Sequence, residues 1–262
     1  MSATRIPVYQ VDAFASRVFT GNPAAVCPLE QWLPDDQMQA IAAENNLAET
    51  AFFVPNGGGY HLRWFTPTVE VDLCGHATLA SAFVIFDKLD PAAQSVEFFT
   101  KSGKLIVTRE GDLLSLDFPA RQPLECEVYP GLIPAMGGQP EKVLASADYL
   151  VVYATEAELR NVQPDMDALA TADRFAVIAT APGRDVDFVS RFFAPKQGIP
   201  EDPVTGRAHC TLIPYWSKRL GKAKLRAYQA SPRGGELWCE DRGERVTISG
   251  KAVPFLEGTI YL

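Results

Sequence analysis

Apolar runs alternate with short polar or glycine-rich segments along the first part of the chain, and this pattern predicts strands with a helix between them. Pro7–Phe14 has the mixed apolar character of a strand. Ala51–Val54 and Leu62–Phe65 predict two more strands, and Gly57–Gly59 predicts a hairpin connection between them. The segment 34–46 predicts a helix, because its first turn is acidic and its apolar residues fall on one face. That face is formed by Met38, Ile41 and Ala42.

Two further segments predict helices of a different kind. Cys74–Phe86 is apolar or small on every side, which is typical of a helix buried all round. A similar segment runs from Gly206 to about Trp216, and Pro214 within it is expected to kink or shorten the helix. Strands with glycine-centred turns are expected after each buried helix.

The two buried helices belong to a longer internal repeat. Arg63–Pro67 recurs as Arg191–Pro195, an offset of 191 − 63 = 128, and Gly75–Ala77 recurs as Gly206–Ala208, an offset of 206 − 75 = 131. A third match, which starts at Gly103, has an offset of 235 − 103 = 132. Unrelated short matches would scatter, and solenoid repeats have periods of roughly 20–50 residues. The sequence therefore predicts a duplicated domain.

The predicted fold class is α+β, with two pseudo-equivalent domains that each wrap a curved mixed sheet, or barrel, around a central buried helix. The predicted domains are 1–120 and 121–253, with the linker at Pro119–Pro123. Val253–Leu262 predicts a last strand that is left over after the second repeat. This C-terminal strand, taken as 254–262, is a candidate to complete the first domain, and the sequence leaves open which domain it closes.

Composition excludes several functional classes. A net charge of −8 over 262 residues argues against nucleic-acid binding, because phosphate backbones are bound by clustered basic residues. The chain starts without a charged and apolar leader and has no apolar stretch of membrane-spanning length, so we expect a cytoplasmic protein that does not enter a membrane. Five cysteines without a Cys-x-x-Cys pair indicate reduced thiols, and no metal or cofactor is predicted.

The two copies differ where polar side chains could carry chemistry. Glu49 precedes an apolar strand and aligns with residues that carry no acid, so it is a candidate general base, or else a solvated turn carboxylate. His76 lies at the start of the first buried helix where the second copy has Arg207, and it could exchange protons or cap the helix. Asp202 lies in a loop that is three residues longer in the second copy, interpreted as an insertion of 201–203, and could also cap a helix. An asymmetric site in a cleft between the domains is the hypothesis that follows.

At these residues the chain resembles the PhzF-like family of phenazine-biosynthesis isomerases. The resemblance rests on blocks that together span nearly the whole chain and are specific only in combination. The blocks are Val11–Phe14 with Gly21–Val26, Asn46–Phe52, Phe65–Pro67 with Cys74–Thr78, and Phe193–Pro195 with Glu201–Gly206.

The resemblance implies the fold of diaminopimelate epimerase, no cofactor, and a homodimer that acts on a small anionic metabolite. It implies that Glu49 is the catalytic acid/base, assisted by His76 and Asp202. The candidate substrate-binding residues are Asn22, Gly75, Gly206 and Arg207. Arg207 replaces a small residue of the family, and would favour a further anionic group on the substrate if it faced the cleft.

The leading hypothesis is a cofactor-independent isomerase in which Glu49 shifts a proton within a carboxylate-bearing substrate. One alternative is a racemase or epimerase that uses Cys74 as a thiol base, although the second copy places Thr205 at the matching position, 205 − 74 = 131. A second alternative is a non-catalytic binding or scaffold protein with the same fold.

Overall fold

The computed structural model describes residues 4–262, which form two compact units. The first unit ends at Asp117 and is completed by Ser249–Leu262, and the second unit is Phe118–Ile248. The domain boundaries predicted from the sequence, at 120/121 and 253/254, lie a few residues from the boundaries in the structure. Residues 1–3, which contribute to the expected absence of a leader, lie outside the described residues.

The first unit is a mixed sheet with a buried helix. Its strands follow the order β16-β1-β2-β3-β4-β6-β7-β8, with the short β5 paired to β4. The strands are β1 (Arg5–Ala13), β2 (Asn22–Pro28), β3 (Glu49–Asn56), β4 (Gly59–Phe65), β5 (Glu70–Val71), β6 (Ser95–Thr100), β7 (Gly103–Glu110), β8 (Leu113–Pro119) and β16 (Ala252–Tyr261). The helices are α1 (Asp35–Asn45), α2 (Gly75–Val84) and the π-helical η1 (Ile85–Leu89).

The second unit is built in the same way, with strand order β15-β14-β13-β12-β11-β10-β9. Its strands are β9 (Lys142–Ala145), β10 (Tyr149–Val152), β11 (Val177–Pro182), β12 (Phe188–Phe193), β13 (Lys224–Gln229), β14 (Gly235–Asp241) and β15 (Arg245–Gly250). Its helices are α3 (Leu132–Met136), α4 (Glu156–Asn161), α5 (Met166–Leu169), the 3₁₀ turn η2 (Pro195–Gln197) and α6 (Gly206–Leu220).

Strand pairing shows that the two units share one topology. In the first unit β1/β2, β3/β4 and β6/β7 pair antiparallel, while β2/β3 and β4/β6 pair parallel. In the second unit β9/β10, β11/β12 and β13/β14 pair antiparallel, while β10/β11 and β12/β13 pair parallel. The α+β prediction with two pseudo-equivalent domains is therefore confirmed.

Each unit contains an arginine–glutamate ion pair at the equivalent position. Arg63 on β4 binds both carboxylate oxygens of Glu70, at 2.8 and 3.0 Å, and Arg191 on β12 binds both oxygens of Glu201, at 2.7 and 2.9 Å. Glu201 therefore corresponds to Glu70, at an offset of 201 − 70 = 131.

This correspondence corrects the position of the predicted three-residue insertion. Val71 pairs with Trp64 on β4, and the matching Asp202 N–H donates to the carbonyl of Phe192 on β12. Asp202 thus stands where the first copy has Val71, and the segment 201–203 is not inserted. The additional residues lie upstream, where the second copy forms η2.

Each unit has one central helix, as the apolar segments predict. Every residue of α2 from His76 to Val84 is buried except Phe83, and the helix packs against β1, β2, β3 and β16. The second helix, α6, packs against β13 and β14 and continues to Leu220, so the expectation that Pro214 shortens it is wrong. Proline leaves the carbonyl four residues earlier without its helical donor. Here the Arg121 N–H donates to that carbonyl, of Cys210, at 2.9 Å.

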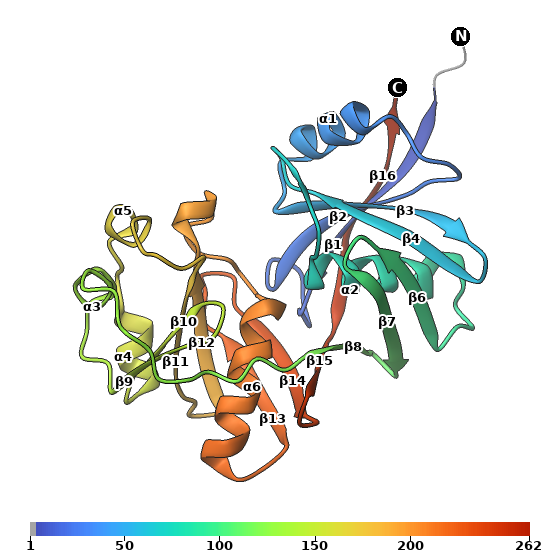
Figure 1. Ribbon diagram of the computed structural model, residues 1–262. Helices are drawn as coiled ribbons and strands as arrows, with labels where there is room; N and C mark the ends of the chain where they lie inside the picture. The colour runs from blue at the N-terminus through green and yellow to red at the C-terminus, as the bar shows by residue number, and fades with distance from the viewer. Residues whose placement is uncertain (1–3) are drawn as a thin grey trace. The chain divides into compact units, whose positions relative to one another are not determined.

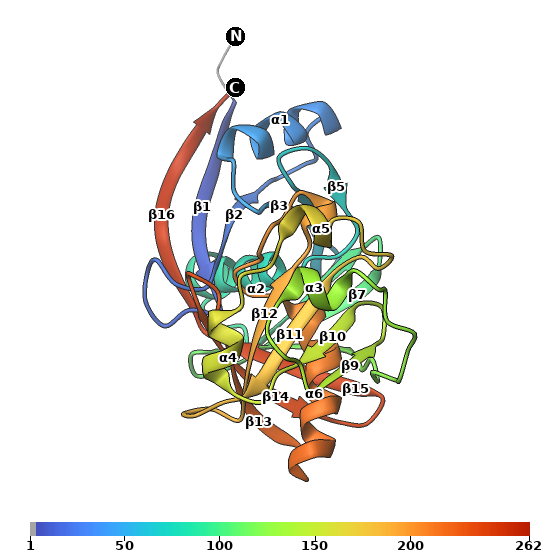
Figure 2. The same ribbon diagram turned by 90° about the vertical axis from the view of Figure 1, so that its left-hand side faces the viewer.

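The C-terminal strand completes the first unit. β16 pairs antiparallel with β1 from Tyr261 to Ala252, and Figures 1 and 2 show the red C-terminal strand beside the blue N-terminal one. This pairing settles which repeat the last strand closes. Within residues 4–262 no helix is long and apolar enough to cross a membrane.

Candidate active site

Asn22 is placed by a turn that only glycine fits well. Gly21 has φ +69°, and a Cβ on it would lie 2.2 Å from the carbonyl oxygen of Ala13. The turn brings Asn22 back as the first residue of β2, directly opposite Ala13 on β1. The Asn22 side chain is fully buried there. It is consequently held inside the unit rather than presented at a surface turn.

Glu49 is placed by the end of helix α1. Asn46 takes the left-handed conformation, φ 49°, and its N–H donates to the carbonyl of Ala42, which ends the helix. The chain then enters β3 at Glu49, which pairs with Ala24 of the parallel strand β2. The Glu49 side chain is 14% exposed, so the carboxylate lies in a mostly desolvated position.

His76 is placed by the first turn of α2. Cys74 precedes the helix in an extended conformation, and the Thr78 hydroxyl donates to the Cys74 carbonyl at 2.6 Å. Gly75 is the first helical residue, and His76 follows it with only 6% of its surface exposed. The start of a helix leaves backbone N–H groups without helical partners, and these attract anions.

These three segments bring four side chains together. The Nε2 atom of His76 lies 3.0 Å from Oε2 of Glu49. Its Nδ1 atom lies 3.2 Å from Nδ2 of Asn22 and 3.5 Å from Sγ of Cys74. The structure therefore joins Glu49 and His76, two residues that are 27 positions apart in sequence, as the hypothesis of a shared site requires.

The surroundings change the protonation of two of these groups. Burial by itself disfavours the charged ring of His76, but the Cys74 sulfur and the Glu49 carboxylate favour it, and the pKa of His76 is raised well above its ordinary value. Burial, and then the Glu49 charge, raise the pKa of the Cys74 thiol. A raised pKa favours the neutral thiol of Cys74, so the contact that remains for a charged His76 ring is the one with the Glu49 carboxylate, at 3.0 Å.

The same cluster has the donor atoms of a metal site. One ligand atom each from Glu49, Cys74 and His76 lies within 4.8 Å of the others. Thiolate, imidazole and carboxylate are ligands of Zn²⁺. However, the Cys74 sulfur lies closer to Nδ1 of His76 than to Nε2, at 3.5 against 4.0 Å, whereas Glu49 faces Nε2. One ion could not use both partners through a single ring nitrogen, so this arrangement fits a proton relay better than a metal.

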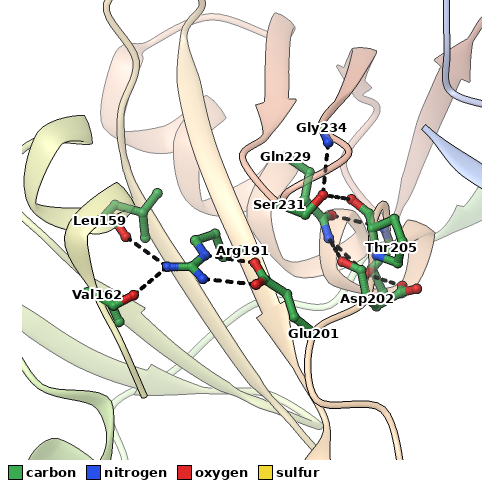
Figure 3. Close-up of polar contacts among 10 residues, drawn as sticks. Leu159, Val162, Arg191, Glu201, Asp202, Thr205, Gln229, Ser231 and Gly234 are labelled. Carbon is green, nitrogen blue, oxygen red and sulfur yellow. Dashed lines mark hydrogen bonds and ion pairs between the residues drawn. The ribbon is translucent and has the colours of Figure 1, made fainter. Parts of the chain in front are cut away.

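The second unit holds Asp202 in a braced loop, shown in Figure 3. The hydroxyl of Thr205 donates to the Asp202 carboxylate, and the Gln229 amide donates to the Asp202 carbonyl at 2.8 Å. The Thr205 N–H in turn donates to Gln229 Oε1 at 2.9 Å, and Ser231 Oγ donates to the Pro203 carbonyl at 2.8 Å. These hydrogen bonds hold Asp202 in place four residues before α6 begins at Gly206.

Arg207 is bound by a buried carboxylate. Its guanidinium donates to both oxygens of Asp148, at 2.8 and 2.9 Å, and lies over the ring of Phe175 at 4.4 Å from the centroid. Asp148 is fully buried and directly precedes β10. Asp148 therefore neutralises the positive charge of Arg207. The sequence hypothesis had expected that charge to bind a further anionic group of a substrate.

The predicted site residues thus fall into two groups. Asn22, Glu49, Gly75 and His76 belong to the first unit, and Asp202, Gly206 and Arg207 to the second. Sequence reasoning missed the partners that brace the second group. These are Asp148, Thr205, Gln229 and Ser231. Thr205 lies in the block Glu201–Gly206, where nothing marked it as a partner of Asp202, and the other three lie in none of the blocks.

Comparison with known proteins gives extensive matches. A family model, PhzC-PhzF, described as "Phenazine biosynthesis-like protein", matches residues 11–258. An uncharacterized isomerase of Pseudomonas aeruginosa is 53% identical over 257 residues, which cover 98% of this chain and 99% of the relative. The crystal structure of a PhzF family protein of Enterococcus faecalis has a TM-score of 0.97 at 50% identity, and the match covers 99% of this chain and all of the other.

A more distant match is to a solved hydroxyproline epimerase from Agrobacterium vitis. The TM-score is 0.59 at 11% identity, with 100% of this chain and 93% of the other covered. At that identity the likeness shows a shared fold alone.

Proposed function

Because the chain belongs to the PhzC-PhzF family of phenazine biosynthesis-like proteins and is an isomerase, we propose that it shifts a proton within a small carboxylate-bearing metabolite, with Glu49 as the general acid/base. The observation that carries this proposal is the 3.0 Å contact between the Glu49 carboxylate and Nε2 of His76. A mostly buried carboxylate next to an imidazole is suited to proton transfer, because both groups can change charge without reorganising much water.

The proposed reaction uses one base. Glu49 takes a proton from an activated C–H bond of the substrate, and the electron pair of that bond moves into the adjacent unsaturated system. Glu49 then returns a proton to a different carbon, so the substrate changes its double-bond position without net gain or loss of atoms. His76 keeps the carboxylate oriented and can exchange its Nε2 proton with it.

The proposed substrate carries a carboxylate. The N–H groups of Gly75 and His76 lie in the first turn of α2, where helix geometry favours a negative charge. Assistance by Asp202 and substrate contacts at Gly206 stay predictions from the sequence.

The racemase alternative depends on Cys74. Its sulfur is close to His76, but the raised pKa of the thiol leaves little thiolate to act as a base at neutral pH. Racemisation also needs a second base on the opposite face of the substrate carbon. The binding-protein alternative differs in having no turnover at all.

The first experiment identifies a metabolite retained by the purified protein by mass spectrometry, and then measures its conversion in deuterated water. Isomerisation predicts deuterium at a new carbon with a moved double bond, whereas racemisation predicts deuterium at an inverted stereocentre. Glu49→Gln keeps the size of the side chain but removes the base, and we expect turnover to fall at least about 1,000-fold. Glu97→Gln, on strand β6 with a side chain that is 42% exposed, is the matched control and should retain turnover. Full turnover in Glu49→Gln would exclude the proposed base.

A further inference from the structure

The two ring nitrogens of His76 face partners of opposite kinds. Nε2 faces the carboxylate of Glu49, which only accepts hydrogen bonds. Nδ1 faces the amide nitrogen of Asn22 at 3.2 Å and the sulfur of Cys74 at 3.5 Å. The amide nitrogen only donates, and a thiol that keeps its proton can donate as well. The neutral ring therefore accepts at Nδ1 and carries its proton on Nε2, toward Glu49.

A proton relay requires a second state of the same ring. When His76 becomes an imidazolium, Nδ1 also carries a proton and needs an acceptor. A half-turn of the Asn22 side-chain amide replaces its nitrogen with its oxygen at the same place. A carboxylate could serve only the charged ring, and a hydrocarbon side chain could serve neither state.

We infer that Asn22 is a positioning residue whose amide follows the protonation state of His76, donating to Nδ1 of the neutral ring and accepting from Nδ1 of the imidazolium. This assigns Asn22 a role different from the substrate contact that the family resemblance implied. The inference rests on the proposed function, in which His76 exchanges protons with Glu49. Among the described residues, Glu49 and Cys74 are the ionisable groups that contact the ring.

The second unit supports this assignment by contrast. Arg207 occupies the position of His76 in the repeat, 207 − 76 = 131, and Asp148 binds it. Asp148 directly precedes β10, and Asn22 is the first residue of the corresponding strand β2. The strand registers align Asp148 with Ala24, two residues after Asn22, so the corresponding strands present different groups at neighbouring positions. One presents a carboxylate to a permanent cation, and the other presents a neutral amide to a ring that can gain and lose a proton.

The test titrates the ring of His76 by ¹⁵N NMR in the substrate-free protein, assigned by loss of its signals in His76→Gln. We expect the unaltered protein to show the Nε2–H tautomer above the pKa of His76. Asn22→Asp, which places a carboxylate beside Nδ1, should raise that pKa by at least one unit. Asn22→Leu should lower it and weaken the preference for the Nε2–H tautomer, which Glu49 and Cys74 still favour. Asn56→Asp adds the same charge at the far end of β3 and should change neither property.

Turnover gives a second readout. In Asn22→Asp we expect kcat to fall at least tenfold near neutral pH, with a smaller change in KM and with the pH profile displaced upward. An Nδ1–H tautomer in the unaltered protein, or an unchanged His76 titration in both variants, would overturn the inference. The NMR result needs no substrate, so it is independent of whether Glu49→Gln confirms or excludes the proposed reaction.

Discussion

Arg207 and Asp148 form a two-point ion pair in which one partner is fully buried. Nε and Nη2 of Arg207 donate to the two carboxylate oxygens at 2.8 and 2.9 Å. The Arg207 side chain itself is 36% exposed, so solvent screens part of the attraction. The pair therefore has a structural role at the start of α6 that does not depend on any ligand.

Removal of the Asp148 charge is expected to destabilise the second unit. Asp148→Asn leaves a guanidinium without its anion, and we expect a loss of about 2 kcal/mol in the free energy of unfolding. Arg207→Gln leaves the carboxylate of Asp148 buried without its cation, with a cost of similar size. In a double-mutant cycle followed by urea denaturation, the double variant should lose less than the sum of the two single variants. Additive losses would contradict the pairing.

The turn before Asn22 makes a second prediction. Gly21→Ala introduces a Cβ that would lie 2.2 Å from the Ala13 carbonyl oxygen, at a positive φ of 69°. Gly111→Ala is the matched control, because Gly111 has a similar φ of 60° but nothing within 4 Å of the new Cβ. We expect the control to lose about 1 kcal/mol from the positive φ, and Gly21→Ala to lose about 3 kcal/mol and to displace Asn22. Equal thermal unfolding of the two variants would contradict this reading.

The sequence predicted the elements of each unit because they follow from local pattern. The apolar face of α1 at Met38, Ile41 and Ala42 is buried as expected, and the all-apolar segment from Cys74 became the buried helix α2. The asymmetric residues Glu49 and His76 were also recognised, because duplication makes a break in the repeat visible. These inferences needed only spacing and residue type.

What the sequence did not reveal depends on contacts between distant residues. The Cys210 carbonyl that Pro214 leaves without a donor is satisfied by Arg121, which is 210 − 121 = 89 residues away. The repeat offsets showed that the second copy has three additional residues, but they did not show at which positions these residues are added. Only the bond between Arg191 and Glu201 fixes the alignment of Asp202 with Val71. Asp148 likewise became visible only through its bond to Arg207.

The two arginine–glutamate pairs are expected to differ in strength. Arg191 and Glu201 are 10% and 13% exposed, whereas Arg63 and Glu70 are 20% and 18% exposed. Arg63 also keeps Asp35 as a partner at 2.8 Å after its glutamate is removed. We therefore expect Glu201→Gln to cost about 3 kcal/mol and Glu70→Gln about 1 kcal/mol, measured by urea denaturation at pH 7. A larger loss in Glu70→Gln would contradict this ranking.

The Glu70 pair should also depend on pH. Its hydrogen bonds to Arg63 lower the pKa of Glu70 to about 2, against the opposing effect of burial. A lowered pKa means that the folded state binds the proton more weakly than the unfolded state, so the contribution is complete above about pH 4.5 and is lost as the pH falls toward 2. The Glu70→Gln variant should lack this part of the acid sensitivity.

His209 gives the protein a second acid-sensitive group, in the core of α6. Its Nδ1–H donates to the carbonyl of Thr205 at 2.8 Å, and the side chain is fully buried. Burial lowers the pKa of His209 to about 4. The unfolded state therefore takes up a proton at His209 near pH 6.5, while the folded state resists it until about pH 4. Stability that is complete above pH 6.5 is consequently lost as the pH falls to 4, by about 3 kcal/mol at most.

The first copy suggests how to remove this sensitivity. Thr78 is the residue that matches His209 in the repeat, 209 − 78 = 131, and its hydroxyl donates to the Cys74 carbonyl as the His209 ring donates to that of Thr205. We expect His209→Thr to lose about 2 kcal/mol at pH 7.5, because the smaller side chain leaves a cavity. Between pH 7.5 and 5, however, its free energy of unfolding should fall by about 2 kcal/mol less than that of the unaltered protein. An equal acid response in the variant and the unaltered protein would show that His209 does not titrate as its burial requires.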